Sequence, residues 1–303
     1  MRNLRITTGE LAKICGVSQG TVDRALNGRA GINIKTKEKI LNTAKEFGYR
    51  PFEGNNNSEK EKSKQIGIIV FNLKNEYFSD LITNIEAECC KIGYSTVAMF
   101  TNYNKQHEIE CIKRMYNIGV EGLILCAVNS GEEFSEFLRG LNMTVVAVGN
   151  DIHSVPYIGI DDFAAMKDLT NHIIEKEFKN IIYFSPAIQY EDAYAQKRRF
   201  EGFLEAVKDK RPYSVICDIA KINEIYPDDT AIICSNDYYA LKVFFKAKNV
   251  KIIGFDNIYI LDKYKIPITS VDYSSTLIAQ EAVDAIINKR NKGTVIDYKI
   301  VER

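Results

Sequence analysis

Residues 19–24 carry the side-chain types that contact nucleic acid. Val22, Ala25 and Leu26 follow the i, i+3, i+4 spacing of a buried helical stripe. The opposite face of this helix then presents an amide, a hydroxyl, a carboxylate, a guanidinium and a glycine: Gln19, Gly20, Thr21, Asp23 and Arg24. Such groups donate and accept hydrogen bonds at base edges and phosphates. The chemistry expected of this segment is contact with DNA.

A preceding helix must hold this segment in place. Thr7 and Glu10 have the spacing of a capping box, which predicts a helix start. Leu11 and Ile14 fall on one face of that helix, and Gly16 can supply the left-handed residue that ends it. The spacing therefore predicts a helix, a tight turn and a second helix.

Two further helix boundaries follow. Ser18 can cap the second helix, and Asn27-Gly28 can end it. Asn33 can cap a third helix that Gly48 ends, with a buried stripe of Ile40, Leu41, Ala44 and Phe47. Residues 1–51 are thus predicted to form a three-helix domain with a helix-turn-helix.

The charge distribution favours the same function. The whole chain has 40 Lys or Arg and 40 Asp or Glu, but residues 1–51 hold ten basic side chains against four acidic ones. A basic segment joined to an acidic remainder is expected if only the first part meets phosphate, because neutralising phosphates releases counterions. The alternative is a small helical protein-interaction domain with a solvated basic face.

Length and composition bound the other possibilities. A chain of 303 residues with 46% hydrophobic residues can bury the cores of two or three domains. No apolar run is long enough to cross a bilayer, and the N-terminus lacks the apolar segment of a signal peptide, so we expect a cytoplasmic protein without membrane association. Seven scattered cysteines without a CxxC pair predict buried thiols rather than a metal or redox site.

Residues 52–65 are polar and indicate a linker. Beyond it, apolar runs such as 66–71, 94–100, 122–127 and 144–149 alternate with amphipathic segments, and a second series of this kind begins after Asp161. Buried strands between helices predict parallel sheets. The expected fold class is α/β, with two doubly wound subdomains whose ligand site lies beyond the carboxyl ends of the strands.

These features together resemble the lactose repressor (LacI/GalR) family of transcription regulators over essentially the whole chain. The stretches 12–18 and 21–27 resemble the family's helix-turn-helix, 35–40 and 48–51 resemble its third helix and exit, and the chain from Ile66 resembles its sugar-binding core. That core shares its fold with type I periplasmic binding proteins. The resemblance implies a homodimer on a pseudo-palindromic operator, controlled by a small molecule in the interdomain cleft.

The resemblance also assigns roles in the DNA-binding domain. Gln19, Gly20 and Arg24 correspond to base-facing positions, where Arg24 can donate to guanine O6 and N7. Asp23 departs from the family's frequent Ser, and it either accepts from cytosine N4 or holds Arg24. Thr21 contacts phosphate or only packs within the domain. The expected DNA-binding residues are Thr8, Ser18, Gln19, Gly20, Thr21, Arg24, Asn27 and Arg29.

The linker departs further from the family. Related proteins often have a hinge helix with a Leu that wedges into the minor groove, whereas 53–58 here read Glu-Gly-Asn-Asn-Asn-Ser. Gly and Asn disfavour a helix, and no apolar wedge is present. The sequence predicts either little operator kinking or coupling without an ordered hinge helix.

In the core, the resemblance places polyol-binding side chains near strand ends and helix starts. The expected effector-binding residues are Asn75, Tyr77, Phe78, Asn150, Lys197, Arg199, Asn236, Asp256 and Asp272. Structural alternatives remain for several positions. Arg199 could pair with a surface acid, Phe78 could belong to the core, and Asp161 and Asp237 are expected to be helix caps.

Enzyme functions are disfavoured. The three histidines lie in unrelated contexts, without a nucleophile elbow, P-loop or zinc spacing, so no cofactor or metal is expected. A homodimer is expected because one small domain makes too few base contacts, and the helices near 79–92, 105–118 and 274–290 are the predicted dimer surfaces. The alternatives are a sugar- or purine-binding protein that does not bind DNA, and an α/β enzyme using the same cleft.

Overall fold

The computed structural model describes residues 8–26, 29, 31–46, 63–141, 143–189 and 194–303. The chain divides into two compact units, Met1–Glu61 and Lys62–Arg303. We call the first unit the head and the second unit the core. Residues 52–62 of the predicted linker, the Thr7 cap, Phe47 and the C-terminal boundary at Gly48 lie outside the described residues, as does Asn27. Gln65, which was predicted to belong to the linker, begins the first strand of the core.

The described part of the head forms three helices, as predicted: α1 (Thr8–Cys15), α2 (Gln19–Leu26) and α3 (Ile34–Glu46). Gly16 has φ +67° and supplies the left-handed residue after α1. The Ser18 hydroxyl accepts from the Thr21 amide at 3.2 Å, and the Asn33 side chain accepts from the Lys35 amide at 2.9 Å. These two contacts confirm the predicted caps of α2 and α3.

Buried apolar side chains fill the centre of the head: Leu11, Ala12, Cys15, Val22, Ala25, Ile40 and Ala44. The prediction was wrong for Ile14 and Leu41, which are 47% and 40% exposed. Each is adjacent to a buried residue, Cys15 or Ile40, on a helix that buries only one narrow stripe. On α1 the buried stripe consists of Leu11, Ala12 and Cys15, and Ile14 lies outside it.

One part of the core is a six-stranded parallel sheet with the order β11-β5-β4-β3-β1-β2. Its strands are β1 (Gln65–Val70), β2 (Ser95–Phe100), β3 (Gly122–Leu125), β4 (Thr144–Val148), β5 (Tyr157–Gly159) and β11 (Thr294–Val295). Its helices are α4 (Glu76–Lys91), α5 (Lys105–Ile118), α6 (Glu132–Arg139) and α11 (Ser275–Ile287). We call this part the N-subdomain.

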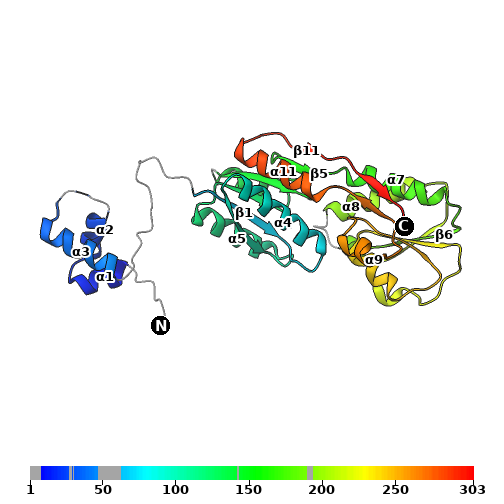
Figure 1. The fold of residues 1–303 in the computed structure, drawn as a ribbon, viewed down its shortest axis with the longest axis horizontal. Coiled ribbons are helices and arrows are strands. Elements are labelled where there is room, and N and C mark those ends of the chain that lie inside the picture. Colours follow the sequence, from blue (N-terminus) through cyan, green and yellow to red (C-terminus); the bar gives the residue numbers. More distant parts are fainter. Residues whose placement is uncertain (1–7, 27–28, 30, 47–62, 142, 190–193) are drawn as a thin grey trace. The chain divides into compact units, whose positions relative to one another are not determined.

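Helices cover both faces of this sheet. In β1, Ile68 packs with α4 and α11, whereas Ile69 points the other way and packs with α5 and α6. Helices α4 and α11 lie side by side although almost two hundred residues separate them in the sequence (Figure 1). The near-continuous apolar strands are explained by this burial from both sides.

The second part of the core, the C-subdomain, contains a four-stranded parallel sheet with the order β7-β6-β8-β9. Its strands are β6 (Asn180–Phe184), β7 (Tyr213–Ile216), β8 (Thr230–Cys234) and β9 (Lys251–Ile253), and its helices are α7 (Asp162–Ile174), α8 (Tyr194–Val207), α9 (Asp237–Phe244) and α10 (Tyr259–Lys263). Two short 3₁₀ helices are η1 (Pro186–Gln189) and η2 (Ile219–Lys221). The α/β fold class with two parallel sheets is confirmed.

The chain passes between the two sheets three times. It enters the C-subdomain after β5, returns after β10 (Ser270–Asp272) into α11, and leaves β11 for β12 (Lys299–Val301), which pairs antiparallel with β10. The very short strands β5 and β11 and the helix α10 were not predicted, since two to five residues carry too little periodicity.

Among the described residues, no helix is long and apolar enough to span a membrane. Within the same residues, no three His, Cys, Asp or Glu side chains are placed to hold a metal ion. The expectation that all cysteines are buried was wrong for Cys90, which is exposed, while its neighbour Cys89 is buried. Adjacent residues on α4 necessarily point in different directions.

Candidate functional site

The outer face of α2 presents the predicted DNA-binding residues. Ser18, Gln19, Gly20 and Arg24 are exposed, and Thr21 is half-buried with its hydroxyl 2.9 Å from that of Ser18. A Cβ added to Gly20 would meet only the Ser18 oxygen at 3.9 Å, so the packing of the head does not require this glycine. Thr8 is the first residue of α1. The structure therefore brings the α2 residues together on one accessible surface.

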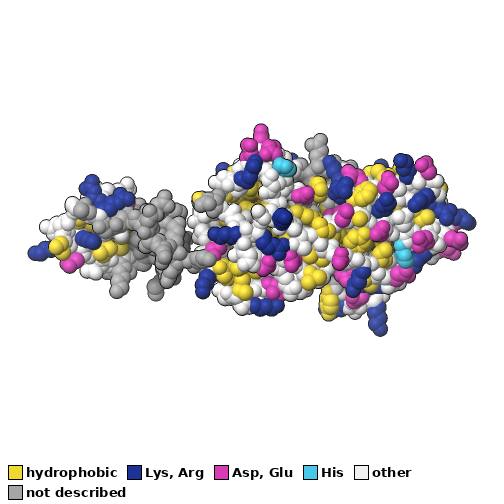
Figure 2. Space-filling view, turned by 90° about the horizontal axis from the view of Figure 1, so that it is seen from above, with side chains coloured by type: hydrophobic (Ala, Val, Ile, Leu, Met, Phe, Trp, Pro, Cys, Tyr) yellow, Lys and Arg dark blue, Asp and Glu magenta, His cyan; other side chains and the backbone are white. Residues whose placement is uncertain are grey.

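Asp23 adopts an arrangement that sequence reasoning missed. Its carboxylate accepts from Arg29 at 3.1 Å, and both side chains are at least half exposed. This pair connects α2 to the segment that follows it, although an exposed pair contributes little stability. Lys and Arg predominate over Asp and Glu on the part of the head that is seen in Figure 2.

A cleft of about 1090 Å³ lies between the two subdomains of the core. Among the described residues, nine aromatic side chains line it: Phe71, Tyr77, Phe78, Tyr103, Tyr157, Phe184, Tyr238, Tyr239 and Tyr273. Its charged lining residues are Lys74, Asp162, Arg199, Asp218, Lys242 and Asp256. Aromatic faces combined with a few oriented polar groups are typical of small-molecule sites.

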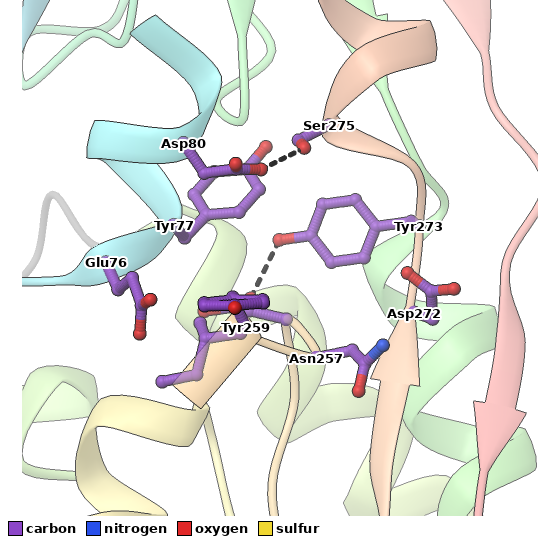
Figure 3. A pocket seen from close by; sticks show the side chains of 10 residues that line it. Glu76, Tyr77, Asp80, Asn257, Tyr259, Asp272, Tyr273 and Ser275 are labelled. Carbon is purple, nitrogen blue, oxygen red and sulfur yellow. Dashed lines mark hydrogen bonds between the residues drawn. The ribbon is translucent and has the colours of Figure 1, made fainter. Parts of the chain in front are cut away.

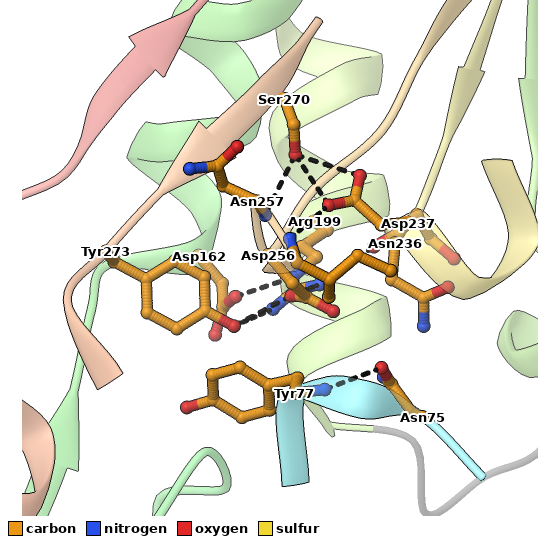
Figure 4. Close-up of polar contacts among 12 residues, drawn as sticks. Asn75, Tyr77, Asp162, Arg199, Asn236, Asp237, Asp256, Asn257, Ser270 and Tyr273 are labelled. Atoms are coloured by element: carbon orange, nitrogen blue, oxygen red, sulfur yellow. Dashed lines mark hydrogen bonds and ion pairs between the residues drawn. The ribbon is translucent and has the colours of Figure 1, made fainter. Parts of the chain in front are cut away.

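Arg199 on α8 is the centre of the polar network in this cleft (Figure 4). Its Nε donates to Asp162 Oδ1 at 2.7 Å, and its Nη1 donates to Asp256 Oδ1 at 3.1 Å and to the Ser235 carbonyl at 2.8 Å. The guanidinium also lies 3.7 Å from the centre of the Phe255 ring. The alternative that Arg199 pairs with a surface acid is wrong, because both of its carboxylate partners are buried.

Burial and the charge of Arg199 have opposite effects on the two carboxylates. Burial raises the pKa of Asp162 and of Asp256, and Arg199 opposes the rise in both. Coulombic attraction to the two carboxylates raises the pKa of Arg199 although burial alone would lower it. The guanidinium is therefore charged and already neutralised by protein groups.

Asp256 lies at the point where the two subdomains meet. The Tyr273 hydroxyl donates to its Oδ1 at 2.7 Å, and a hydrogen bond from the Asn75 side chain lowers its pKa. Tyr273 belongs to the segment between β10 and α11, and Asn75 precedes α4 of the N-subdomain. The backbone of Asp256 has φ +104°, a strained conformation that persists only where the surroundings fix it, which is common at binding sites.

Asn75 has a second role. Its Oδ1 accepts from the Tyr77 amide at 3.2 Å and caps α4, which begins three residues earlier than the sequence indicated. Tyr77 and Phe78 follow in the first turn, with ring centres 5.3 Å apart. Phe78 lines the cleft and also packs against the hydrophobic core, so it is both a cleft residue and a core residue.

Asn150 bridges the two subdomains. Its Nδ2 donates to the Ala127 carbonyl after β3 at 2.5 Å, and its Oδ1 accepts from the Ala195 amide in α8 at 3.3 Å. Gln196, the next residue, lines the cleft, and its buried Oε1 has no hydrogen-bond partner among the described residues. Sequence reasoning missed Gln196, although its i, i+3 spacing from Arg199 places both on one helical face.

Lys197 is not among the residues that line the cleft. It lies two positions before Arg199 on α8, which corresponds to nearly opposite faces of a helix. The structure therefore does not bring Lys197 together with Arg199 in the cleft.

Asp272 lies outside the cleft as well. It borders a separate cavity of about 50 Å³ with Asn257, Tyr259 and Ser275 (Figure 3) and pairs with Lys299 at 3.2 Å. Successive residues of a strand point to opposite sides, so Tyr273 reaches the cleft and Asp272 does not. The alternating side-chain directions along β10 could have indicated from the sequence that Asp272 and Tyr273 point to opposite sides.

Two predicted caps had different outcomes. Asp161 caps α7 by accepting from the Ala164 amide, which confirms that prediction. For α9 the prediction of Asp237 was wrong, because Asn236 is the cap and accepts from the Tyr239 amide at 2.9 Å. Asn236 also lines the cleft.

Asp237 is instead fully buried below the cleft wall. It accepts from the Ile258 amide at 2.9 Å and from the Ser270 hydroxyl (Figure 4). Burial, and after it the charge of Asp256, raises the pKa of Asp237 to about 8. This carboxyl joins the start of α9 to the loop that carries Asp256.

A helix-turn-helix head joined to a two-subdomain core with a polar cleft is the organisation of a ligand-responsive DNA-binding protein. The chain belongs to the LacI family. Residues 7–51 match the family model of bacterial regulatory proteins of the lacI family, and residues 63–296 match that of periplasmic binding proteins and the sugar-binding domain of the LacI family. It is therefore a DNA-binding transcription regulator rather than an enzyme.

Relatives and solved structures agree with this assignment. The NTD biosynthesis operon regulator NtdR of Bacillus subtilis (strain 168) is 26% identical over 98% of this chain and 96% of its own. A periplasmic binding protein/LacI transcriptional regulator from Alkaliphilus metalliredigens QYMF, complexed with D-xylulofuranose, has a TM-score of 0.69 at 21% identity over 80% of this chain and 98% of its own. The lac repressor dimer bound to operator and the anti-inducer ONPF has a TM-score of 0.66 at 16% identity, over 99% of this chain and 98% of its own. The two structures establish the fold.

Proposed function

We propose that this protein is a cytoplasmic repressor that binds a pseudo-palindromic operator as a homodimer and is controlled by a carbohydrate in the interdomain cleft. The observation that carries the proposal is the cleft itself, whose polar groups come from both subdomains. A ligand that contacts both subdomains stabilises one of their relative orientations, and so it can shift a conformational equilibrium. The D-xylulofuranose complex and the operator-bound lac repressor dimer support the two halves of the proposal.

The composition of the cleft favours a polyol over an apolar ligand. Gln196 and Asn150 provide amides, Asp256 provides a carboxylate, and aromatic faces such as that of Tyr77 can pack on the apolar face of a sugar ring. Because Asp162 and Asp256 neutralise Arg199, this guanidinium does not demand an anionic ligand. These features support an uncharged sugar.

For the homodimer, the surface formed by α4 and α11 is our candidate. Leu277 and Ile287 on α11 and Ile92 at the end of α4 are exposed apolar side chains on these adjacent helices. Two heads held in this way would contact two half-sites, as helix-turn-helix dimers do. The predicted operator contacts Gln19, Gly20, Thr21, Arg24 and Arg29 remain part of this proposal, together with Thr8, Ser18 and Asn27.

The effector half is tested by thermal unfolding of the full chain against monosaccharides, oligosaccharides, sugar phosphates and purines. A ligand at one hundred times its dissociation constant should stabilise the native state by about 2.7 kcal/mol. Binding of the full chain to a duplex that it selects from a random library is then titrated with each stabilising compound. Operator binding that no sugar alters would contradict the carbohydrate assignment.

Gln196→Leu should weaken the binding of one sugar, the one that gives the largest thermal shift. The affinity should fall by about 2- to 13-fold, the effect of losing one hydrogen bond. Without ligand, the variant should be as stable as the wild type, since the unpartnered buried Oε1 is removed. Isothermal titration calorimetry measures the affinity. Lys197→Leu is the matched control on the same helix, and a larger loss in that variant would contradict the site described here.

Arg24→Ala should weaken binding to the selected operator by about 1–3 kcal/mol, because it removes a donor pair that can read guanine. Arg24→Lys keeps the charge and lacks the two-pronged geometry, so it should retain non-specific binding while losing most of the sequence preference. Competition gel shifts with the selected duplex and with a scrambled duplex measure the ratio. Unchanged discrimination in both variants would argue against base readout by Arg24.

A further inference from the structure

An aromatic pair lies at the rim of the cleft on the N-subdomain. Phe71 follows β1 and Tyr103 follows β2, and these neighbouring parallel strands end together because Val70 is in register with Phe100. The Asn102 amide donates to the Phe71 carbonyl at 2.7 Å and fixes the two loops to each other. The rings stack with centres 4.7 Å apart and planes 14° apart. This pair is a rigid flat surface facing the cleft.

Core packing does not explain the position of Tyr103. Its side chain is 60% exposed, and its backbone has φ +61°, a left-handed conformation that bulky residues rarely adopt. Asn102 before it also has a positive φ, +50°. A strained backbone that holds an aromatic ring in the open is more typical of ligand contact than of stability.

A second aromatic surface lies on the C-subdomain side of the cleft. Tyr238, in the first turn of α9, lines the same cleft as Tyr103, and the Lys242 ammonium lies 4.3 Å from the centre of its ring. Tyr103 lies on the N-subdomain and Tyr238 on the C-subdomain, and both line this one cleft. The cleft is thus bounded at its rim by one aromatic ring from each subdomain. We call Tyr103 and Tyr238 the aromatic rim.

The aromatic rim and the polar network around Asp256 are two parts of one site. A continuous series of contacts joins them: Tyr103 stacks on Phe71, Phe71 packs on Phe78, Phe78 on Tyr77 and Tyr77 on Tyr273, whose hydroxyl donates to Asp256. Because both parts line the same cleft, one elongated ligand can contact both.

The size of the cleft agrees with a ligand of this length. Its 1090 Å³ exceed the upper end of the range of about 300–1,000 Å³ that holds drug-sized ligands, and one sugar ring is smaller than such ligands. A single ring bound to the polar network would leave the aromatic rim unused.

We propose that the effector is an oligosaccharide of two or more rings, with one ring at the Arg199–Asp256 network and the next ring held between Tyr103 and Tyr238. This inference rests on the proposed carbohydrate effector and extends it. The first ring is fixed by hydrogen bonds to the amides and carboxylate. The second ring packs its apolar face on an aromatic ring, and Lys242 can donate to its hydroxyls.

The absence of Trp from the chain allows a direct test. Tyr103→Trp keeps an aromatic ring at the rim and introduces a single fluorophore there. The probes are glucose, xylose, sucrose, maltose, maltotriose, cellobiose and cellotriose, each measured by thermal shift and by Trp emission. We expect at least one sugar of two or three rings to stabilise the protein and to change the emission of this variant. Tyr116→Trp, on the exposed side of α5 away from the cleft, should give no change with the same sugar.

Tyr103→Ala completes the test, because the exposed ring is not needed for folding. This variant should bind the oligosaccharide about tenfold more weakly, the loss of affinity expected from losing one stacked face. The affinity for any bound monosaccharide should stay unchanged. Stabilisation by monosaccharides alone, equal losses for both kinds of sugar, or a bound oligosaccharide without an emission change would overturn the inference and leave the carbohydrate effector standing. If no sugar stabilises a protein that still binds its operator, the proposed carbohydrate effector fails as well.

Discussion

Replacing Arg199 with alanine is expected to lower the free energy of unfolding of the full chain by about 3–5 kcal/mol at neutral pH, because two buried carboxylates lose their shared cation. The guanidinium bridges Asp162 at the start of α7 and Asp256 in the loop after β9, and it also donates to the Ser235 carbonyl after β8. Without it, these three elements of the C-subdomain lose the group that holds them together. Urea unfolding of the wild type and the variant measures the difference.

The loss should depend on pH in a defined direction. Arg199 lowers the pKa of Asp162 and Asp256 against the effect of burial, so its removal raises both further. A carboxyl with a raised pKa in the folded state stabilises that state when protonated, and this stability is lost as the pH rises through the folded-state pKa. The variant should therefore be closer to the wild type at pH 5 than at pH 8.

Arg198→Ala is the matched control for this prediction. Arg198 is adjacent on α8, pairs with Glu201 on the surface and lies over Phe163. Its removal should change stability by less than about 1 kcal/mol. Equal effects of the two substitutions, or an Arg199→Ala variant as stable as the wild type at pH 8, would show that the buried network does not hold the subdomain together.

The elements of this fold could be predicted from the sequence where their periodicity extends over a few turns or a full strand. Helices α5 and α9 begin at the predicted residues, and the caps at Ser18 and Asn33 follow from side-chain chemistry alone. The exposure of Ile14 could not be predicted, because it depends on how closely three short helices approach one another. Helix α4 starts early because Asn75 acts as its cap, although its side chain also reaches the cleft.

For the cleft, the sequence predicted the residue types near strand ends but not their orientation. Arg199 and Asp256 were expected to contact a ligand independently, whereas they bind each other and share Asp162. These ion pairs join residues far apart in the chain, and no local sequence pattern predicts them. In contrast, the helical and strand periodicities already placed Lys197 and Asp272 away from Arg199 and Tyr273, which agrees with their absence from the described lining of the cleft.

The conversion of Asp237 to asparagine should remove a pH dependence of stability from the wild-type protein. Asp237 is fully buried with a pKa raised to about 8, chiefly by burial. Because the folded state holds this proton more tightly than the unfolded chain, stability is highest below the ordinary Asp pKa and falls as the pH rises towards 8. Asparagine has no proton to lose, and its amide can still accept from the Ile258 amide and donate to Ser270.

The free energy of unfolding of Asp237→Asn should accordingly match that of the wild type near pH 4–5 and exceed it by on the order of a few kcal/mol at pH 9. Urea unfolding across this pH range measures the difference. Asp228→Asn, in an exposed loop of the same subdomain, should leave the difference constant with pH. A wild type whose stability does not fall between pH 5 and 9 relative to Asp237→Asn would contradict the buried, protonated carboxyl. Since Asp237 joins α9, which begins after Asn236, to the loop of Asp256, its ionisation should also loosen the C-subdomain wall of the cleft. Effector affinity should therefore weaken above pH 8 in the wild type and remain constant in the variant.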